Sequence, residues 1–242
     1  MVEQGEGTLY IAKCIVTLPT LYPRVPAAEP SSTEQDIFEA ALVAFAQHGR
    51  TGARMQQIAD AAGINKSMLH YYFRTKADLY EAVFAHAMER FMASFDHEAL
   101  HEASTFAELL RRFIDGYVAF CQSHIHAVRL LVSENLRGGP LLAEHLQQMA
   151  DAGTDTPPRL FRDAIETAIE TGEIRPVDPD HTLLTIIASC IFPFVARPTV
   201  ERMHPPVTSD WSAFVEMRKE QIFDVVYHGL QPASVSSSSS SA

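Results

Sequence analysis

Two histidines four residues apart give the clearest candidate for metal chemistry in this chain. The run His97-Glu98-Ala99-Leu100-His101 fits the H-E-x-x-H pattern, in which the histidines bind zinc and the glutamate acts as a base. Such a site needs a third protein ligand, no downstream residue stands out as one, and five-residue patterns arise by chance in a chain with eleven histidines. The motif therefore supports two secondary hypotheses, a metal-sensing regulator and a zinc-dependent hydrolase.

Positive charge is concentrated between Gln47 and Lys76. This segment has five basic side chains and one acidic side chain, a net charge of +4, whereas the other 14 basic and 29 acidic residues leave −15. The formal net charge of −11 argues against a protein that coats nucleic acid over its whole surface. A basic segment in an acidic chain is typical of a DNA-contacting domain on a body with another role.

The elements that must position these residues are predicted to be helices, about nine to ten in total. Apolar residues recur at three- and four-residue steps, no strand-like alternation of useful length occurs, and glycines and prolines separate the segments. After a first helix that Gly49 closes, the expected helices are 54–62, a short one after Asn65, 76–95, 106–121, 125–136, 141–149, 159–171, 181–195 and 211–230. The expected fold class is all-α.

The composition is that of a globular protein. The 242 residues are 47% hydrophobic and 20% charged, with a mean hydropathy of −0.03. Three widely spaced cysteines support neither a disulfide framework nor a cysteine-based zinc site, so a cytoplasmic location is expected. Residues 1–30 are predicted to be a poorly ordered arm without a signal peptide or membrane span, and 232–242 a disordered serine-rich tail.

Residues 58–65 have the pattern of a helix-turn-helix. Ala59 and Ala62 are small enough for two helices to cross closely, Gly63 accepts the conformation of the turn, and Asn65 can cap the next helix. The helix after Asn65 would then lie in the major groove of DNA and offer phosphate and base-edge contacts. The candidate DNA-binding residues are Arg54, Lys66, Ser67, Met68, His70, Tyr71, Arg74 and Lys76.

The run from Gln57 to Tyr80 resembles the amino-terminal signature of TetR-family transcriptional regulators. The matching positions are Ile58, Ala59, Gly63, Leu69, Tyr71, Tyr72, Phe73, Lys76 and Leu79. The usual threonine at the start of the second helix is Ala53 here, His70 replaces the first tyrosine of the usual pair, and Ser67 and Met68 replace the usual Gly-Thr. The base preferences of other members therefore do not transfer.

The resemblance implies a DNA-binding domain over residues 31–78 and a helical ligand-binding and dimerisation domain over residues 79–231. The candidate ligand-binding residues are aromatic, apolar or scarce polar side chains of this second domain: Phe113, Tyr117, Phe120, Cys121, His124, Leu130, Phe161, Ile165, Cys190 and Phe194. The last two long helices supply the candidate dimer interface: Leu183, Ile187, Ile191, Trp211, Phe214, Ile222 and Val226. Both sets fit an ordinary core equally well by periodicity.

The sequence as a whole predicts a homodimeric transcriptional repressor that a small-molecule effector releases from double-stranded operator DNA. The effector would act by favouring a dimer whose two recognition helices no longer match successive grooves. No cofactor, membrane partner or catalytic residue is expected. The alternatives are the metal sensor and hydrolase based on His97 and His101, and a helix-turn-helix protein that acts as an activator or architectural DNA binder without an inducer.

Overall fold

The computed structural model describes residues 32–151, 153, 155–203 and 210–232. These residues form twelve helices and no strand. The helices are α1 (Ser32–Gly52), α2 (Met55–Ala61), α3 (Lys66–Tyr72), α4 (Lys76–Ala93), α5 (His97–Glu102), α6 (Phe106–Ser123), α7 (Ile125–Asn135), α8 (Pro140–Asp151), α9 (Pro157–Glu170), α10 (Pro179–Val195), α11 (Arg197–Met203) and α12 (Trp211–Leu230). The predicted all-α class is confirmed.

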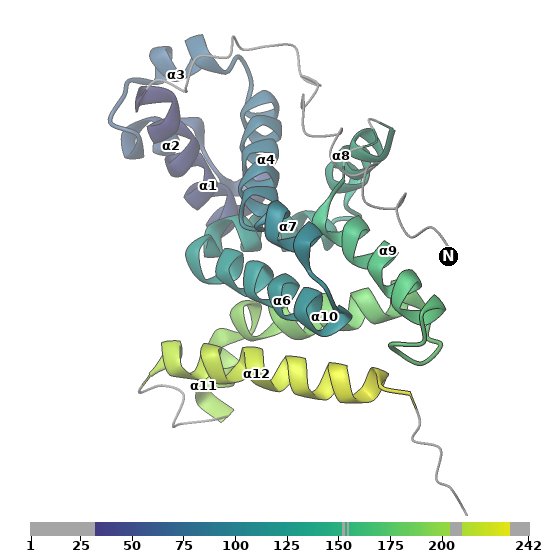
Figure 1. Ribbon diagram of the computed structural model, residues 1–242. Helices are drawn as coiled ribbons and strands as arrows, with labels where there is room; N and C mark the ends of the chain where they lie inside the picture. The colour runs from purple at the N-terminus through teal and green to yellow at the C-terminus, as the bar shows by residue number, and fades with distance from the viewer. Residues whose placement is uncertain (1–31, 152, 154, 204–209, 233–242) are drawn as a thin grey trace, which may run out of the picture.

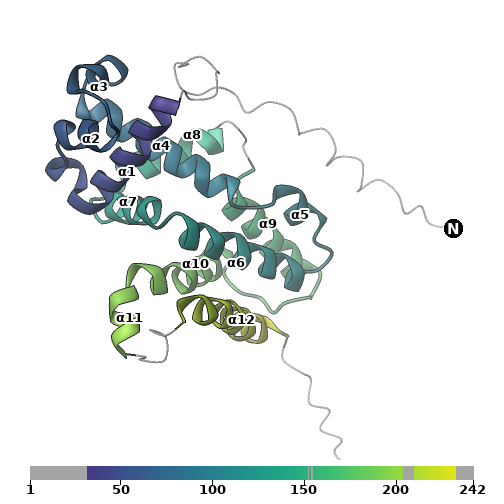
Figure 2. The same ribbon diagram turned by 90° about the vertical axis from the view of Figure 1, so that its left-hand side faces the viewer.

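The helices form a small head and a larger body. Figures 1 and 2 show α1, α2 and α3 together at one end and α12 at the opposite end, with α4 leading from the head into the body. In the body, α6 is central and packs against α9, α10 and α12. A second connection joins head and body, because α7 packs along α1.

Side-chain caps define where many helices begin. The Asn65 side chain accepts a hydrogen bond from the Met68 backbone N–H at 2.8 Å, at the start of α3. Thr75 and Asp78 form a reciprocal capping box at the start of α4. Single side-chain caps, each accepting one backbone N–H hydrogen bond, start α6, α9, α10 and α12 at Thr105, Thr156, Asp178 and Asp210. Each cap satisfies a backbone N–H that the helix itself leaves unpaired, so the starts of these helices are encoded locally.

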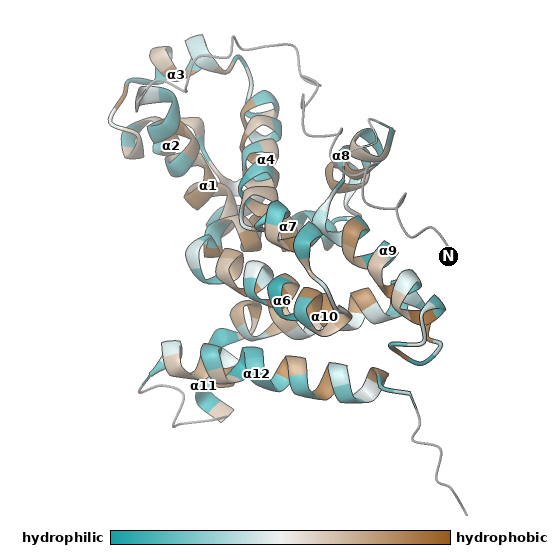
Figure 3. Cartoon of the chain, viewed as in Figure 1, coloured by the Kyte–Doolittle hydropathy of each residue, from teal (hydrophilic) through white to brown (hydrophobic). Residues whose placement is uncertain are grey.

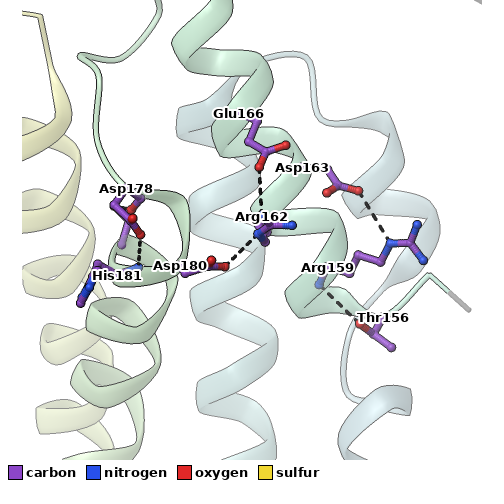
Figure 4. Close-up of polar contacts among 9 residues, drawn as sticks. Thr156, Arg159, Arg162, Asp163, Glu166, Asp178, Asp180 and His181 are labelled. Carbon is purple, nitrogen blue, oxygen red and sulfur yellow. Dashed lines mark hydrogen bonds and ion pairs between the residues drawn. The ribbon is translucent and has the colours of Figure 1, made fainter. Parts of the chain in front are cut away.

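One continuous hydrophobic core runs from Ile37 in α1 to Leu230 in α12. Apolar and polar residues alternate along α9 and α12, as expected for helices with one buried face (Figure 3). Charged pairs then join neighbouring helices at the surface. Arg162 of α9 contacts Glu166 at 3.2 Å and Asp180 of α10 at 2.8 Å (Figure 4). Burial therefore stabilises the fold, and partly exposed ion pairs of this kind add little.

Two short helices differ from the sequence-based expectation. The helix expected over 76–95 ends at Ala93, and Asp96 caps a separate α5, its carboxylate accepting a hydrogen bond from the Ala99 N–H at 2.9 Å. Pro198, expected to break the chain, occupies the first turn of α11, where a missing N–H costs nothing. The expected arm and tail lie outside the described residues.

No single helix in the described part of the chain is long and apolar enough to cross a membrane. The bent pair of α10 and α11, which meet at 79°, satisfies the length and composition criteria only jointly.

Gly116 marks a close approach between α6 and the segment after α4. A Cβ atom at this position would lie 2.7 Å from Cδ1 of Phe95, a ring that is 4% exposed. We expect Gly116→Ala to lower the free energy of unfolding by about 1–2 kcal/mol, because overpacking outweighs the gain in helix propensity. Urea denaturation would measure this change in the free energy of unfolding.

Gly229→Ala is the matched control for this substitution. Gly229 is also helical, and a Cβ there would meet no atom within 4 Å. This control should stabilise the protein slightly, by up to about 1 kcal/mol. Equal effects of the two substitutions would contradict the overpacking explanation.

Candidate DNA-binding surface and effector domain

The second and third helices pack together as a helix-turn-helix. Ile58 and Ala59 of α2 and Leu69 of α3 are fully buried between the helices of the head. Gly63 occupies the turn with φ +69°, a left-handed conformation that glycine adopts without steric cost. The Ile64 backbone N–H donates to the Ala59 carbonyl at 3.0 Å and closes the turn. The turn therefore has the local geometry that its sequence predicts.

Seven of the eight predicted DNA-binding residues lie on the exposed side of the head. Arg54, Lys66, Ser67, Met68, His70, Tyr71 and Arg74 are exposed. Tyr71 is 84% exposed, whereas Leu69, two residues earlier on α3, is fully buried. The Tyr71 ring lies edge-on to Tyr72 at 5.7 Å and is otherwise in solvent, so its phenol is accessible to a partner. Docking α3 in a major groove would bring this face to the DNA.

One predicted DNA-binding side chain, His70, has a local contact that the sequence does not reveal, whereas Arg54 has no capping role. Ala53 is 1% exposed and cannot reach DNA, and Arg54, the N-cap residue of α2, makes no side-chain cap. The Arg54 side chain is exposed and does not cap α2. The His70 ring nitrogen Nδ1 lies 3.3 Å from the Arg74 carbonyl, which orients the imidazole along its own chain.

Lys76 is the exception among the predicted DNA contacts. Its ammonium group donates hydrogen bonds to the carbonyls of Thr51 at 2.9 Å and Ala53 at 3.2 Å. These carbonyls belong to the end of α1 and to the link between α1 and α2. Lys76 therefore holds the start of α4 against the end of α1, and its contact with DNA stays a prediction.

We expect Lys66→Ala and Lys76→Ala to separate these two roles. Lys66 is exposed, so its loss should leave stability unchanged and reduce the salt dependence of DNA binding by about one counterion. Lys76→Ala should lower the free energy of unfolding by about 1–2 kcal/mol, because it removes two charge-assisted hydrogen bonds. Urea denaturation and DNA titrations across salt concentrations measure the two effects. Equal stability of the two variants would contradict the structural role of Lys76.

The predicted ligand-binding residues form the aromatic core of the body. Nine of the ten are buried, and His124 is partly buried: the set is Phe113, Tyr117, Phe120, Cys121, His124, Leu130, Phe161, Ile165, Cys190 and Phe194. The rings of Phe113 and Phe161 stack at 4.4 Å, which joins α6 to α9. The structure thus brings these residues together as packed neighbours, and their contact with a ligand stays a prediction.

Burial shifts the pKa values of the polar members of this core toward their neutral forms. Burial raises the pKa of the Cys190 thiol to about 12, and it raises the pKa values of Cys121 and Tyr117 further. The imidazole of His124 stacks on Phe120 at 5.5 Å, and burial together with the nearby Arg90 lowers its pKa. Neutral, polarisable groups in an aromatic surrounding suit a largely apolar ligand.

Sequence analysis missed two central members of this aromatic core, Phe91 and Phe95. Phe91 lies edge-on to Tyr117 at 5.4 Å and to Phe120 at 5.1 Å. Phe95 lies 5.4 Å from Phe113. Their four-residue spacing was a visible signal of a buried helix face, but it extended an apolar pattern already assigned to α4.

The seven predicted dimer-interface residues all pack at least partly against the core of their own chain. Ile222 is 3% exposed, and Leu183, Ile187, Ile191, Trp211, Phe214 and Val226 are partly buried. Their neighbours are exposed instead: Leu184 and Phe192 of α10 by 62% each, Val195 by 44%, and Met217 and Val225 of α12 by 61% and 69%. These five residues form the exposed apolar stripes of α10 and α12. They are better candidates for an interface than residues that pack against their own chain.

The H-E-x-x-H pattern forms α5 rather than the end of α4. The His97 ring nitrogen Nε2 lies 3.2 Å from the Met92 carbonyl, and Glu98 and His101 are exposed. Within the described residues, no group of three histidine, cysteine, aspartate or glutamate side chains is placed to hold a metal ion. The geometry therefore gives the histidine pair no third ligand.

An exposed recognition helix on a compact head, carried by a larger helical body, defines a helix-turn-helix DNA-binding protein. Residues 37–83 match the family model of bacterial regulatory proteins of the tetR family. Residues 107–226 match the tetracyclin repressor-like C-terminal domain. The chain belongs to the TetR family of transcriptional regulators.

Relatives of known class cover most of the chain. The HTH-type transcriptional regulator RutR of Escherichia coli strain K12 is 29% identical over 202 residues, which is 84% of this chain and 92% of RutR. The HTH-type transcriptional repressor NicS of Pseudomonas putida is 28% identical over 201 residues, covering 79% of this chain and 92% of NicS.

Solved structures share the fold at low sequence identity. The hemolysin II transcriptional regulator HlyIIR superposes with a TM-score of 0.57 and 18% identity, over 84% of this chain and 99% of HlyIIR. Bacillus subtilis FadR, in complex with stearoyl-CoA, superposes with a TM-score of 0.59 and 18% identity, over 81% of this chain and 99% of FadR.

Proposed function

We propose that the protein is a cytoplasmic, homodimeric repressor that binds operator DNA and that a small-molecule effector releases. The observation that carries this proposal is the exposed surface of α3 on a head that matches the tetR-family model. Its Lys66, Tyr71 and Arg74 side chains offer charge and hydrogen bonds to phosphates and base edges. The protein acts by binding alone, without catalysing a reaction.

The exposed apolar stripes of α10 and α12 support the homodimer. Leu184 and Phe192 lie eight residues apart along α10, and Met217 and Val225 lie eight residues apart along α12. Exposed side chains of this size at helical spacing mark an association surface. A two-fold interface between these helices would present two heads to successive major grooves of a palindromic operator.

The aromatic core between α6, α9 and α10 supports an effector site in the body. It combines a large apolar surface with two thiols and a phenol, which is the composition of a site for a mainly apolar small molecule. Bacillus subtilis FadR, solved in complex with stearoyl-CoA, gives one example of a protein of this fold with a bound ligand. An effector needs only to bind more tightly to the dimer whose heads are out of register.

Fluorescence anisotropy with the DNA immediately upstream of the gene tests the proposal. We expect a dimer to bind this fragment more tightly than a random fragment of equal length, with affinity that falls steeply as salt rises. A reporter driven by the same DNA should be repressed by the intact protein. Transcription that rises instead would favour the activator alternative, and binding equal to that of random DNA would count against a site in this region.

A further inference from the structure

Glu134 is a buried carboxylate at the point where three helices meet. It belongs to α7 and is 3% exposed, the one charged side chain in the described part of the chain that is buried. Its Oε2 accepts a hydrogen bond from the Tyr80 hydroxyl of α4 at 2.9 Å. Its Oε1 accepts one from the Leu141 backbone N–H, in the first turn of α8, at 3.4 Å. One carboxylate therefore bridges α4, α7 and α8.

Tyr80 extends this bridge into the head. Its ring is fully buried and lies edge-on to Phe45 of α1 at 4.9 Å. The Arg50 guanidinium, at the end of α1, lies 5.2 Å from the centre of the same ring. Burial and the neighbouring Glu134 raise the pKa of Tyr80 to about 12, so its hydroxyl keeps its proton and donates at neutral pH.

Two guanidinium groups lie close to Tyr80 at this junction. Arg50 comes from the head, and Arg137 comes from the turn between α7 and α8, where it donates to the Ser133 hydroxyl at 3.0 Å. Gly49 interrupts α1 with a non-helical φ of +68°. A Cβ atom added at Gly49 would lie 3.2 Å from Nη2 of Arg137, so this side chain rests against the break in α1. Both guanidinium groups therefore lie where the end of α1 meets α7 and the turn before α8.

By contrast, α8 is attached to the body by few contacts. It has no buried residue, although its sequence is amphipathic. Its contacts with α4 include His145, whose ring lies 6.2 Å from that of Phe84. A helix with so little buried surface can shift or open at low cost in free energy. The Glu134 hydrogen bond holds its first turn.

We propose that Glu134 is a positioning residue that couples α8 to the DNA-binding head through Tyr80. The inference rests on the proposed function and names the route by which a change in the body reaches the head. When α8 moves, Glu134 loses one hydrogen bond and is free to release Tyr80, which contacts α1 through Phe45. Because coupling is reciprocal, DNA bound to the head must stabilise the first turns of α8.

Hydrogen exchange measured by mass spectrometry, with and without the upstream DNA fragment, tests this coupling. In the wild-type protein we expect DNA to slow exchange in α3 and, by about fivefold or more, in residues 134–146. In Tyr80→Phe the slowing in α3 should remain, and the slowing in residues 134–146 should fall below about twofold. Tyr227→Phe removes a phenol hydroxyl from α12, which is remote from the junction, and should behave like the wild type.

The ratio of exchange with and without DNA separates coupling from stability. A purely structural loss speeds exchange equally in both conditions and leaves the ratio unchanged. Glu134→Gln, with circular dichroism to confirm folding, provides a second variant and should lower the ratio as well. An unchanged ratio in both variants, or no slowing of residues 134–146 in the wild type, would overturn the inference alone. Failure of the wild type to form any specific DNA complex would overturn the proposed function and the inference with it.

Discussion

Replacing Phe192 with glutamate is expected to convert the dimer into monomers and to lower operator affinity by at least about a hundredfold. Phe192 is 62% exposed at the centre of the α10 stripe. At a two-fold interface the substitution buries two carboxylates without partners, and each costs several kcal/mol in an apolar contact. A monomer then contacts one half-site only, so the gain from binding two linked half-sites is lost. Sedimentation velocity and fluorescence anisotropy measure the two effects.

Two controls separate the interface from a general effect of surface charge. Phe192→Leu keeps an apolar side chain at the same position and should remain a dimer. Leu136→Glu places the same charge at a side chain that is 84% exposed in the turn after α7, and it should also remain a dimer. If the Phe192→Glu protein stays dimeric, α10 does not form the dimer interface, and the prediction is wrong.

The helix boundaries of the head were predictable because their signals are local. Asn65, Gly63 and Thr75 act through hydrogen bonds and backbone conformations within a few residues of themselves, and each has the role that its type predicts. The start of α10 after Asp178 follows the same logic. Where a cap or a turn determines the local structure, the residues responsible lie within a few positions of one another in the sequence.

The orientation of α10 was not predictable, because this helix is apolar on most of its surface. Ile187 and Phe192 are both large and apolar, yet one packs partly against the core and the other is exposed. Periodicity identifies a buried face only when the opposite face is polar. The neighbours in space, α6, α9 and α12, decide which side is covered. The exposed residues of α10 are therefore identified only in the structure, and the predicted interface residues stay a prediction.

The role of Lys76, a charged residue, was also not predictable from the sequence. Its position in the basic segment favours a phosphate contact, but its ammonium group meets the carbonyls of Thr51 and Ala53, more than twenty residues earlier in the chain. Glu134 is a second example, since its partner Tyr80 is 54 residues away. A solvated charge and a charge that joins two elements look alike in sequence, and only the packing of α1 against α4 and α7 distinguishes them.

Phe161→Ala is expected to lower the free energy of unfolding by about 3–5 kcal/mol, the cost of a large cavity in a packed core. The ring is 1% exposed, stacks on Phe113 at 4.4 Å and lies 5.7 Å from Phe106. Urea denaturation at fixed protein concentration measures this change, because dimerisation contributes to apparent stability. The exposed control Leu136→Ala should change the same quantity by no more than about 0.5 kcal/mol.

The change in the free energy of unfolding caused by Phe161→Ala also distinguishes two roles of the aromatic core, a packed interior and the wall of an effector site. A ring that fills the interior loses its contacts on every side when it is truncated, whereas a ring that lines an open effector site loses them on one side only. A cost below about 1 kcal/mol would therefore contradict the core role and place Phe161 at the wall of a site. A full cost would mean that an effector that enters between α6 and α9 must displace the packed rings of Phe113 and Phe161.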